Sequence, residues 1–322
     1  MKIGILGAGE IAHEMAKTVA GMADCEVLAV GARELPRAGG FAKEHGIPRA
    51  YGSYGELVAD KEVELIYIAT PHSHHYQHAK LALEAGRHVL CEKAFTANAS
   101  QARELFALAE ARGLFLGEAM WTRFLPMKAK LQQLLHDGAI GQVRSLSASI
   151  GYAISDIPRL REPALAGGAL LDIGVYVLNF AAIVLGEEIE KVASSCELYE
   201  TGVDACESVT LTFSGGRMAV LHANMTALSD RGGVICGSEG YIRVGDVETC
   251  APLEVYDGER RLVARHEAPP CHSGYQYEVA AAAKAVREGR GECPEMPHAE
   301  TLRILELCDR LRDAWGVRYP FE

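Results

Sequence analysis

The stretch Gly7-Ala8-Gly9-Glu10-Ile11-Ala12 lies between a strand-like segment, Lys2–Leu6, and a helical pattern over Glu10–Met22. It matches the pattern G-x-G-x-x-A, in which the glycines permit a tight turn and a close approach of the backbone to a pyrophosphate. The N-terminus of the following helix favours the negative charge of that group. An ordinary turn between a strand and a helix would not need glycine at both positions. The residues predicted to contact a dinucleotide here are Gly7, Gly9, Glu10 and Ile11.

Short apolar runs alternate with helical patterns through the first third of the chain. Strands are predicted over Lys2–Leu6, Glu26–Ala32, Leu65–Ala69, His88–Cys91 and Phe115–Glu118. Helices are predicted over Glu10–Met22, Pro36–His45, His74–Ala85 and Ser100–Arg112. This alternation indicates a parallel sheet that is covered on both faces. We therefore expect an α/β chain whose first domain, residues 1–122, is a doubly wound Rossmann domain that binds a dinucleotide.

The pattern changes after Trp121, where a helix over Pro126–His136 precedes longer runs of alternating polar and apolar residues. Such alternation is typical of antiparallel strands. They are predicted over Val143–Tyr152, Glu190–Leu198, Ser208–Phe213, Met218–Met225, Val234–Val244 and Leu253–Tyr256. Two further helices are predicted, over Gln276–Glu288 and Ala299–Ala314. We expect a second domain, residues 123–322, that is α/β with a large open, mainly antiparallel sheet.

This second domain has too few predicted helices to cover both faces of its sheet. An open apolar sheet face is usually buried against another surface, and two-fold self-association is the commonest way of burying it. We therefore expect a homodimer formed through the C-terminal sheet, so that this domain serves both substrate binding and oligomerisation. A monomer with a polar open face is the alternative.

Composition limits the classes of partner. The chain has 322 residues and a formal net charge of −11, which argues against nucleic acid or an anionic membrane as the main partner. Its nine cysteines include no C-x-x-C pair, as expected of a reduced, cytoplasmic protein. We expect no signal peptide. The apolar segment Ala164–Leu185 approaches the length of a membrane span, but Asp172 and Asn179 within it favour a helix buried in the protein.

The end of the second predicted strand bears on the choice of cofactor. An NAD site usually has an acid there to bind the ribose hydroxyls. This chain has Ala32 at that position, followed by Arg33, with Arg37 four residues further on. A guanidinium group suits a 2′-phosphate, so we predict NADP in preference to NAD. The alternative is that both arginines are solvated surface charges and that Glu34 binds the ribose.

Three residues are candidates for proton transfer. Lys93 follows a predicted strand at the carboxyl edge, where open parallel sheets bind ligands. A lysine there can relay a proton or lower the pKa of a neighbouring phenol, although it could equally be a surface lysine paired with Glu92. Asp172 and Tyr176 are four residues apart on a predicted helix and so share a face. A capping or structural role for Asp172, and a core position for Tyr176, are the alternatives.

Four histidines, His72, His74, His75 and His78, follow Thr70-Pro71. His74 and His78 have helical spacing, but no carboxylate or cysteine with metal-ligand spacing accompanies them, so we expect no metal. The interpretation that we prefer places His72 and His75 beside the cofactor, together with Thr70 and Glu92.

The chain resembles the glucose–fructose oxidoreductase/inositol dehydrogenase (Gfo/Idh/MocA) family over essentially its whole length. The segments that carry the resemblance are the glycine turn, Ala69-Thr70-Pro71-His72-Ser73-His74-His75, Gly86-Arg87-His88-Val89-Leu90-Cys91-Glu92-Lys93 and Gly168-Ala169-Leu170-Leu171-Asp172-Ile173-Gly174. Others resemble the branch of dihydrodiol dehydrogenases and NADP-dependent D-xylose dehydrogenases. These are Ala32-Arg33-Glu34-Leu35-Pro36-Arg37-Ala38, Ala50-Tyr51-Gly52-Ser53-Tyr54, Glu118-Ala119-Met120-Trp121-Thr122-Arg123-Phe124 and Glu200-Thr201-Gly202-Val203-Asp204.

The resemblance implies a role for several residues. Lys93 matches the lysine of the family's Glu-Lys-Pro motif, although Ala94 replaces the proline. Tyr176 matches the acid/base of this branch, and Asp172 matches the family's helix acid. Trp121 and Tyr275 would line the substrate pocket, and Arg123 lies near them in the sequence.

Taken together, these features predict an NADP-dependent oxidoreductase that moves a hydride between nicotinamide and a carbohydrate or vicinal diol carbon. Neutral aldoses such as D-xylose rank first as substrates, trans-dihydrodiols second and phosphorylated sugars last. Tyr176 would accept the hydroxyl proton, while Lys93 and Asp172 would assist it. The alternative is a non-catalytic regulator on the same fold that senses NAD(P) and binds a protein.

Overall fold

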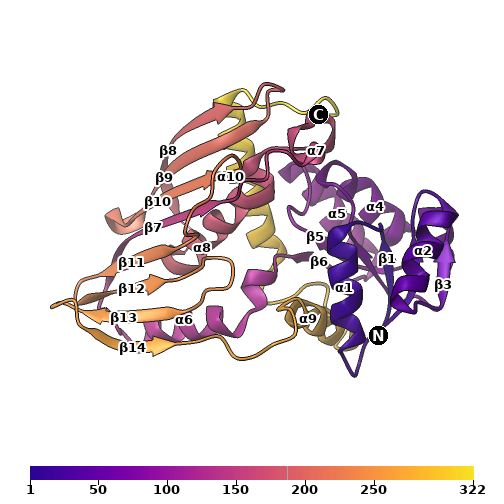
Figure 1. Ribbon diagram of the computed structural model, residues 1–322, viewed down its shortest axis with the longest axis horizontal. Helices are drawn as coiled ribbons and strands as arrows, with labels where there is room; N and C mark the ends of the chain where they lie inside the picture. The colour runs from indigo at the N-terminus through magenta and orange to yellow at the C-terminus, as the bar shows by residue number, and fades with distance from the viewer. Residues whose placement is uncertain (187) are drawn as a thin grey trace. The chain divides into compact units, whose positions relative to one another are not determined.

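The structure is a computed structural model that describes residues 1–186 and 188–322. The chain forms two compact units (Figure 1). Unit 1 consists of Met1–Phe124 and Cys271–Glu306, and unit 2 consists of Leu125–Pro270 and Leu307–Glu322. The predicted division into residues 1–122 and 123–322 lies close to the first boundary. It does not anticipate that Cys271–Glu306 belongs to unit 1.

Unit 1 is built on a six-stranded parallel sheet with the order β3-β2-β1-β4-β5-β6. This is the strand order of a Rossmann fold, and the chain reverses direction between β1 and β4. All five predicted strands agree with the structure to within one residue at each end, and β1 agrees at both ends; the short β3 was not predicted. The strands are β1 (Lys2–Leu6), β2 (Glu26–Gly31), β3 (Arg49–Tyr51), β4 (Leu65–Ile68), β5 (His88–Glu92) and β6 (Leu116–Ala119).

Helices connect these strands and cover the sheet. They are α1 (Glu10–Ala20), α2 (Leu35–His45), α3 (Tyr54–Ala59), α4 (His72–Glu84), α5 (Ala99–Arg112), the 3-10 turn η1 (Trp121–Phe124) and α9 (Gln276–Arg287). Helix α10 (His298–Trp315) begins in unit 1 and ends in unit 2. The predicted helices agree with α1, α2, α4, α5, α9 and α10 to within two residues. The short helix α3 was not predicted. Six residues are too few to show a clear helical period.

The core of unit 1 includes segments from both ends of the chain. One buried cluster joins Ile3 and Ile5 of β1 to Val279 and Ala282 of α9. The cluster of the opposite face includes Leu305 of α10. Because apolar burial is the main stabilising term, these late segments complete a core that the first third of the chain begins.

Unit 2 is built on an eight-stranded sheet with the order β14-β13-β12-β11-β7-β10-β9-β8. Only the central pair β7 and β10 is parallel, so the prediction of a large, mainly antiparallel sheet is confirmed. The strands are β7 (Val143–Gly151), β8 (Ile189–Leu198), β9 (Asp204–Phe213), β10 (Met218–Asn224), β11 (Gly233–Gly237), β12 (Gly240–Val244), β13 (Leu253–Asp257) and β14 (Leu262–His266).

One predicted strand, Val234–Val244, is wrong as a single element. The structure divides it into β11 and β12, which pair antiparallel around a turn at Ser238-Glu239. The turn is flanked by Gly237 and Gly240, and a Cβ atom at Gly237 would lie 2.0 Å from the Ile140 carbonyl oxygen. Strand β14 was also not predicted. Edge strands are half exposed, so their apolar alternation is weak.

The helices of unit 2 include α6 (Pro126–His136), α7 (Pro158–Arg161) and α8 (Val175–Leu185), with the 3-10 turns η2 (Pro163–Leu165) and η4 (Ser214–Gly216). Helix α8 packs on β7 and β10. The stretch Pro163–Leu185 is long and apolar enough to span a membrane, but 89% of its most apolar window is buried. That burial is what the sequence analysis expects of a core helix.

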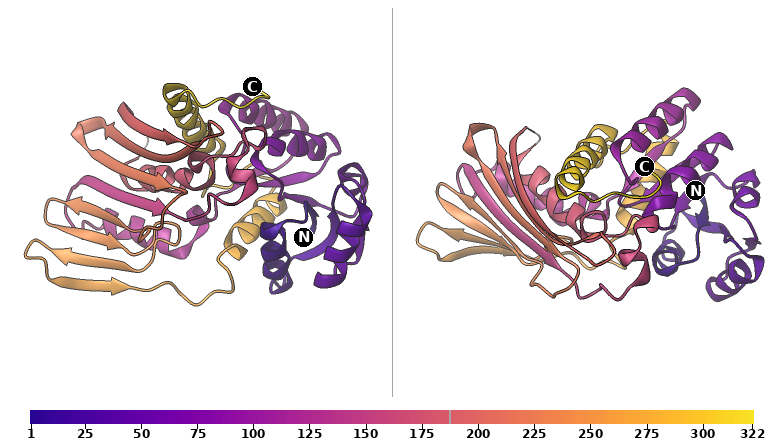
Figure 2. Two further views of the ribbon diagram at one scale, coloured as in Figure 1. Left: turned by 45° about the horizontal axis from the view of Figure 1, so that its top comes forward. Right: turned by 90° about the horizontal axis from the view of Figure 1, so that it is seen from above.

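The other face of the sheet has no helix over it in the described part of unit 2 (Figure 2). Met218 and Val220 of β10 are exposed large apolar residues. Val220 is in register with Ser147 on one side and Thr210 on the other. The predicted open face is therefore present, but it mixes apolar side chains with serine and threonine.

Candidate active site

The glycine turn lies at the reversal point of the parallel sheet. Gly7 has a φ angle of +112°, and a Cβ atom there would lie 2.6 Å from the Ala69 carbonyl oxygen at the end of β4. Only glycine avoids both the strain and the clash. A Cβ atom at Gly9 would meet nothing within 4 Å, so there is open space beside the N-terminus of α1. This space and the helix N-terminus fit a dinucleotide pyrophosphate.

The two arginines predicted to select NADP lie on this side of unit 1. Arg33 follows β2 and lines an open groove together with Glu34, Tyr51 and Ser53. Nη2 of Arg37 donates to the Ala8 carbonyl oxygen at 3.0 Å, so this guanidinium lies against the glycine turn. Because Glu34 lines the same groove, the competing interpretation remains that Glu34 binds the ribose.

The histidine segment forms the first two turns of α4. His75 is completely buried, with Nε2 2.7 Å from the Thr70 carbonyl oxygen and Nδ1 2.9 Å from the Ala94 carbonyl oxygen. It therefore joins the loop after β4 to the loop that carries Lys93. Both ring nitrogens contact the backbone, which makes His75 a positioning residue in this structure, whereas its predicted contact with a cofactor stays a prediction. His72 is also buried, and its ring lies edge-on to that of His75.

Burial lowers the pKa of His75 to about 4, against the effect of the two carbonyl groups. The unfolded chain takes up a proton near pH 6.5, whereas the folded protein does not until about pH 4. The stability contributed by neutral His75 is therefore fully present above pH 6.5 and is lost as the pH falls towards 4. We expect the stability advantage of the wild type over His75→Gln to shrink by about 2.5 kcal/mol between pH 7.5 and 4.5.

Urea unfolding of both proteins across that pH range measures this difference, and taking the difference cancels groups that the two proteins share. A wild-type advantage that stays constant with pH would show that His75 is not held neutral by burial.

Glu92 belongs to a buried acidic group that the sequence analysis found only in part. The Tyr67 hydroxyl donates to Oε1 of Glu92. Glu278 of α9 is completely buried, and neither of its oxygens has a hydrogen-bond partner among the residues that the structure describes. Burial, followed by the charge of Glu92, raises the pKa of Glu278 well above its usual range. Glu278 was missed because its place in a helical sequence pattern is that of an ordinary surface acid.

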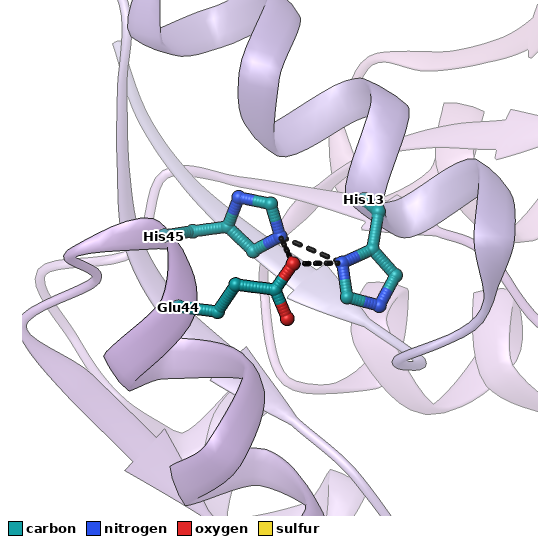
Figure 3. A group of neighbouring side chains, drawn as sticks. All are labelled: His13, Glu44 and His45. Carbon is teal, nitrogen blue, oxygen red and sulfur yellow. Dashed lines mark hydrogen bonds and ion pairs between the residues drawn. The ribbon is translucent and has the colours of Figure 1, made fainter.

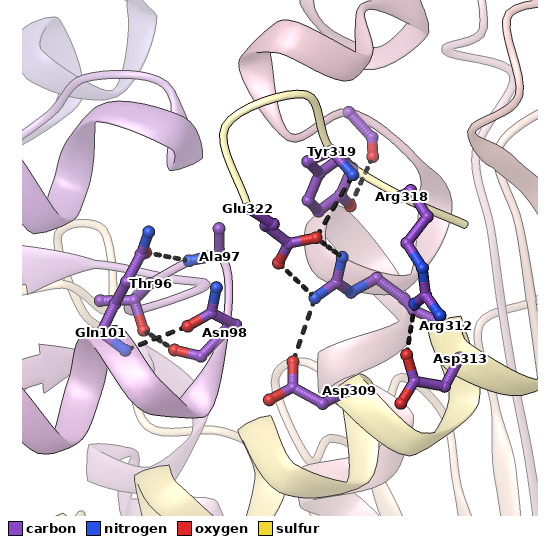
Figure 4. Close-up of polar contacts among 11 residues, drawn as sticks. Thr96, Ala97, Asn98, Gln101, Asp309, Arg312, Asp313, Arg318, Tyr319 and Glu322 are labelled. Carbon is purple, nitrogen blue, oxygen red and sulfur yellow. Dashed lines mark hydrogen bonds and ion pairs between the residues drawn. The ribbon is translucent and has the colours of Figure 1, made fainter. Parts of the chain in front are cut away.

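Lys93 follows β5 at the carboxyl edge of the sheet, as predicted, and is half-buried. The peptide bond between Lys93 and Ala94 is cis. The loop that follows is held by local bonds, in which the Thr96 hydroxyl donates to the Asn98 carbonyl oxygen at 2.8 Å (Figure 4). The Asn98 side chain also accepts from the Gln101 backbone at 3.0 Å and caps α5. These contacts hold the loop that carries the lysine.

The predicted substrate-lining aromatics come together within unit 1. The rings of Trp121 and Tyr275 have centroids 5.2 Å apart, although 153 positions separate them in the sequence. Both are partly buried. The surface that they form is suited to stacking on an unsaturated ring or on the C–H face of a sugar.

Arg123 has a different environment from the one expected. Its guanidinium is buried and forms an ion pair with Glu300 of α10. The same carboxylate binds Arg303. The structure gives Arg123 a role in the core of unit 1, and its contact with a substrate stays a prediction.

In unit 2, Asp172 and Tyr176 are both buried. The helix predicted to carry them is interrupted, because Leu170–Gly174 forms a π-helical turn, η3, before α8 begins at Val175. Turns of this type occur often at functional sites. Asp172 accepts a hydrogen bond from Nη1 of Arg159 at 3.0 Å. Arg159 thus orients the carboxylate.

Two buried acids of β9, Asp204 and Glu207, lie against this turn, and Asp204 binds it. Asp204 accepts from the Leu170 backbone at 2.5 Å, and a Cβ atom at Gly168 would lie 2.3 Å from its carboxylate. A Cβ atom at Gly174 would lie 2.6 Å from Oε1 of Glu207. Burial raises the pKa of Asp204 to about 6. Burial and the charge of Asp204 hold the pKa of Glu207 well above its usual range. The glycines of this segment therefore make room for the acids.

The last residues of the described chain also support the turn (Figure 4). The Tyr319 hydroxyl donates to the Gly167 carbonyl oxygen at 2.9 Å. Arg312 of α10 stacks over the Tyr319 ring, with 4.5 Å between its guanidinium carbon and the ring centroid. It also binds both carboxylate oxygens of Glu322, at 2.8 and 2.9 Å. Both the sheet and the C-terminal residues thus hold the segment that carries Asp172 in place.

The sequence matches two family descriptions along this architecture. Residues 1–119 match an oxidoreductase family with an NAD-binding Rossmann fold, and residues 129–243 match the GFO/IDH/MocA C-terminal domain. The chain belongs to the Gfo/Idh/MocA oxidoreductase family. It is therefore an NAD(P)-dependent dehydrogenase, as the sequence analysis predicted.

Relatives match this dehydrogenase over its whole length. Trans-1,2-dihydrobenzene-1,2-diol dehydrogenase from Xenopus tropicalis is 36% identical over 327 residues, which cover 99% of each chain. The enzyme of that name from Homo sapiens is 35% identical over 328 residues, covering 99% of this chain and 98% of its own. These are the proteins to which the chain is similar in sequence.

Solved structures share the fold. A 3-ketoreductase from Actinomadura kijaniata, in complex with NADP and TDP-benzene, is 28% identical with a TM-score of 0.89, and the match covers 97% of each chain. An aldose–aldose oxidoreductase from Caulobacter crescentus, complexed with glycerol, has a TM-score of 0.88 at 23% identity, covering 98% of this chain and 97% of its own. The second likeness concerns the fold alone.

Proposed function

We propose that the protein is an NADP-dependent dehydrogenase of a CH–OH carbon in a vicinal diol or a carbohydrate, namely a trans-dihydrodiol, an aldose or a polyol. Two observations carry the proposal: unit 1 has a dinucleotide turn and Arg33 after its second strand, and unit 2 has a held acid, Asp172, one turn before a buried tyrosine, Tyr176. The dihydrodiol dehydrogenases that match the whole chain support the diol, and the surface of Trp121 and Tyr275 suits an unsaturated ring.

In this proposal the hydroxyl of the substrate loses its proton to Tyr176 Oη while the hydride leaves the same carbon. When bound, NADP provides the acceptor for that hydride. The Lys93 ammonium group hydrogen-bonds the hydroxyl and, through its charge, favours the phenolate form of Tyr176. Asp172, held by Arg159, orients the phenol and its neighbours. Trp121 and Tyr275 position the carbon skeleton.

A substrate panel tests the function. The value of kcat/KM is measured by absorbance of the reduced cofactor for a benzene trans-dihydrodiol, D-xylose and a sugar phosphate under matched conditions. We expect turnover with one of the two neutral compounds. A preference of tenfold or more for the sugar phosphate, about 1.4 kcal/mol in the transition state, would contradict the proposed substrate class.

The alternative that the sequence analysis left open is a regulator that senses NAD(P) without turnover. The fold and the dinucleotide turn suit such a sensor, but membership of a dehydrogenase family argues against it. Lys93, Asp172 and Tyr176 together favour the enzyme, because a sensor needs none of them. Binding of NADP with no turnover across the panel would favour the regulator.

The preference for NADP rests on Arg33. We expect Arg33→Ala to raise the apparent KM for NADP about tenfold to 100-fold, since a charge-assisted contact contributes about 1.5–3 kcal/mol. The apparent KM for NAD, measured in the same preparation, serves as the control and should change little. Equal use of both cofactors by the unaltered protein would contradict the preference.

A homodimer through the open sheet face of unit 2 is also proposed. Its support is the uncovered face that contains Met218 and Val220. Light scattering at micromolar concentration should give about twice the chain mass of 34.7 kDa. We expect Val220→Glu to give the monomer mass, whereas Leu228→Glu, a 79% exposed residue outside the strands, should not. A wild-type mass equal to that of one chain would overturn the proposal.

The compartment remains a proposal too. All nine cysteines are free thiols. This supports the cytoplasm, where thiols stay reduced.

A further inference from the structure

We propose that His13, Glu44 and His45 form a binding site for a transition-metal ion of the zinc class, on the outer side of unit 1. His13 lies in the first turns of α1, and Glu44 and His45 are the last two residues of α2. The sequence analysis expected no metal and did not consider these residues, which come from two separate helices. The site is independent of the groups proposed for hydride transfer.

Three donor atoms face one another in this cluster (Figure 3). Nδ1 of His13 lies 2.7 Å from Nε2 of His45. Oε1 of Glu44 lies 3.4 Å from the former and 3.7 Å from the latter. The two imidazoles therefore turn a nitrogen each towards the same carboxylate oxygen.

These separations match the size of a zinc site. Atoms 2.7, 3.4 and 3.7 Å apart lie on a circle of about 1.9 Å radius, and zinc binds histidine nitrogen and carboxylate oxygen at about 2.0–2.2 Å. An ion slightly above the plane of the three atoms would therefore reach all of them. A tetrahedral site also needs the two nitrogens about 3.3 Å apart, which a small rotation of the half-exposed His13 ring provides.

The neighbouring residues hold the two imidazole rings in place and leave one coordination position open to water. Phe41 packs against both imidazoles, with ring centroids 4.5 Å from His13 and 4.6 Å from His45. The His45 side chain is 9% exposed, so the packing around it fixes the orientation of its ring. The Glu44 side chain is 59% exposed, so water can complete the coordination. Glu14 and Lys17, which face each other at 2.7 Å, are the nearest other charges on α1.

The donor set selects the metal. Two imidazoles with one carboxylate suit zinc, cobalt, nickel and copper, whereas magnesium and calcium prefer oxygen ligands alone. A bound ion would join α1, which begins at the glycine turn, to α2, which begins after Arg33. Metal binding would therefore stabilise the dinucleotide-binding unit by linking the two helices.

The test uses the full-length protein after treatment with a chelator. Cobalt(II) is titrated by calorimetry, with its visible absorption as a second signal, and zinc is then added as a competitor. We expect one ion per chain and a rise in melting temperature on binding. His13→Gln, Glu44→Gln and His45→Gln should each weaken binding at least about 100-fold. Loss of a residue that only hydrogen-bonds a metal ligand already lowers metal affinity about 10–100-fold.

His74→Gln is the matched control, since His74 contacts another histidine, His78, on α4 and lies outside the cluster. This substitution should leave cobalt binding unchanged. The proposal would be overturned if the wild type does not bind cobalt. It would also be overturned if His74→Gln abolishes binding, or if all three site substitutions leave binding intact. If one site variant does not fold, anomalous scattering from zinc in wild-type crystals locates the ion directly. An ion away from His13 and His45 would contradict the assignment.

Discussion

Replacement of Tyr176 by phenylalanine is expected to lower kcat at least about 100-fold, the lower range for loss of a general acid–base group. The phenol oxygen is the proposed acceptor of the substrate proton, and phenylalanine keeps the ring that α8 buries. Steady-state turnover with the best substrate of the panel measures the effect. Binding of NADP, followed by fluorescence titration, should change little because the glycine turn and Arg33 are untouched.

Lys93→Met tests the other half of the proposed proton-transfer pair. We expect a fall in kcat of the same order, together with a shift to higher pH of the acidic limb of the oxidation rate, where activity rises as the phenol ionises, since the lysine charge no longer favours the phenolate. Tyr199→Phe is a suitable control for the tyrosine variant, because Tyr199 lies outside the proposed site and stacks with Arg161. If Tyr176→Phe turns over at the wild-type rate, Lys93 or a histidine must carry the proton.

Replacement of Arg123 by methionine is expected to lower the free energy of unfolding of unit 1 by about 3 kcal/mol, because removal of one partner from a buried ion pair leaves the other charge uncompensated. Glu300 is buried beside Arg123 and within reach of Glu118, which already has a pKa raised by burial to about 7. The loss of the cation therefore leaves two buried acids with less compensating charge.

The two tryptophans of the chain make the measurement specific. Trp121 lies two residues before Arg123 in unit 1, and Trp315 lies in unit 2. In a Trp315→Phe background, fluorescence follows the urea unfolding of unit 1 alone. Arg303→Met is the control, because this arginine is more exposed and leaves the Arg123 pair intact, so its cost should stay within about 1 kcal/mol. An Arg123→Met protein of wild-type stability with a raised KM would instead favour the predicted substrate contact.

The Rossmann fold of unit 1 could be predicted because its signals are local. Buried parallel strands read as short apolar runs, and the glycine turn marks where the first of them meets its helix. The positions of Lys93 at a strand end and of Arg33 after β2 follow from the same local pattern. Such patterns do not resolve elements as short as β3 and α3. Nor do they show that Val234–Val244 divides into β11 and β12.

Contacts between distant segments could not be predicted. The ion pair of Arg123 with Glu300, the contact of Trp121 with Tyr275 and the burial of Glu278 all depend on Cys271–Glu306 returning to unit 1. The π-helical turn at Asp172 lies against Glu207 of β9, where Gly174 leaves room for the carboxylate. In each case a charged residue in an ordinary helical or strand pattern looks like a surface residue until its partner is known.

Local patterns in the chain thus specified the dinucleotide turn, the parallel sheet and the identity of the proton-transfer candidates, because turn geometry and apolar periodicity act between neighbours in the sequence. The tertiary structure decided which acids are buried with raised pKa values, which arginines bind a carboxylate, and which histidines meet across α1 and α2. Those properties arise from burial and from the electrostatic interaction of groups far apart in the sequence, and neither exists before the chain has folded.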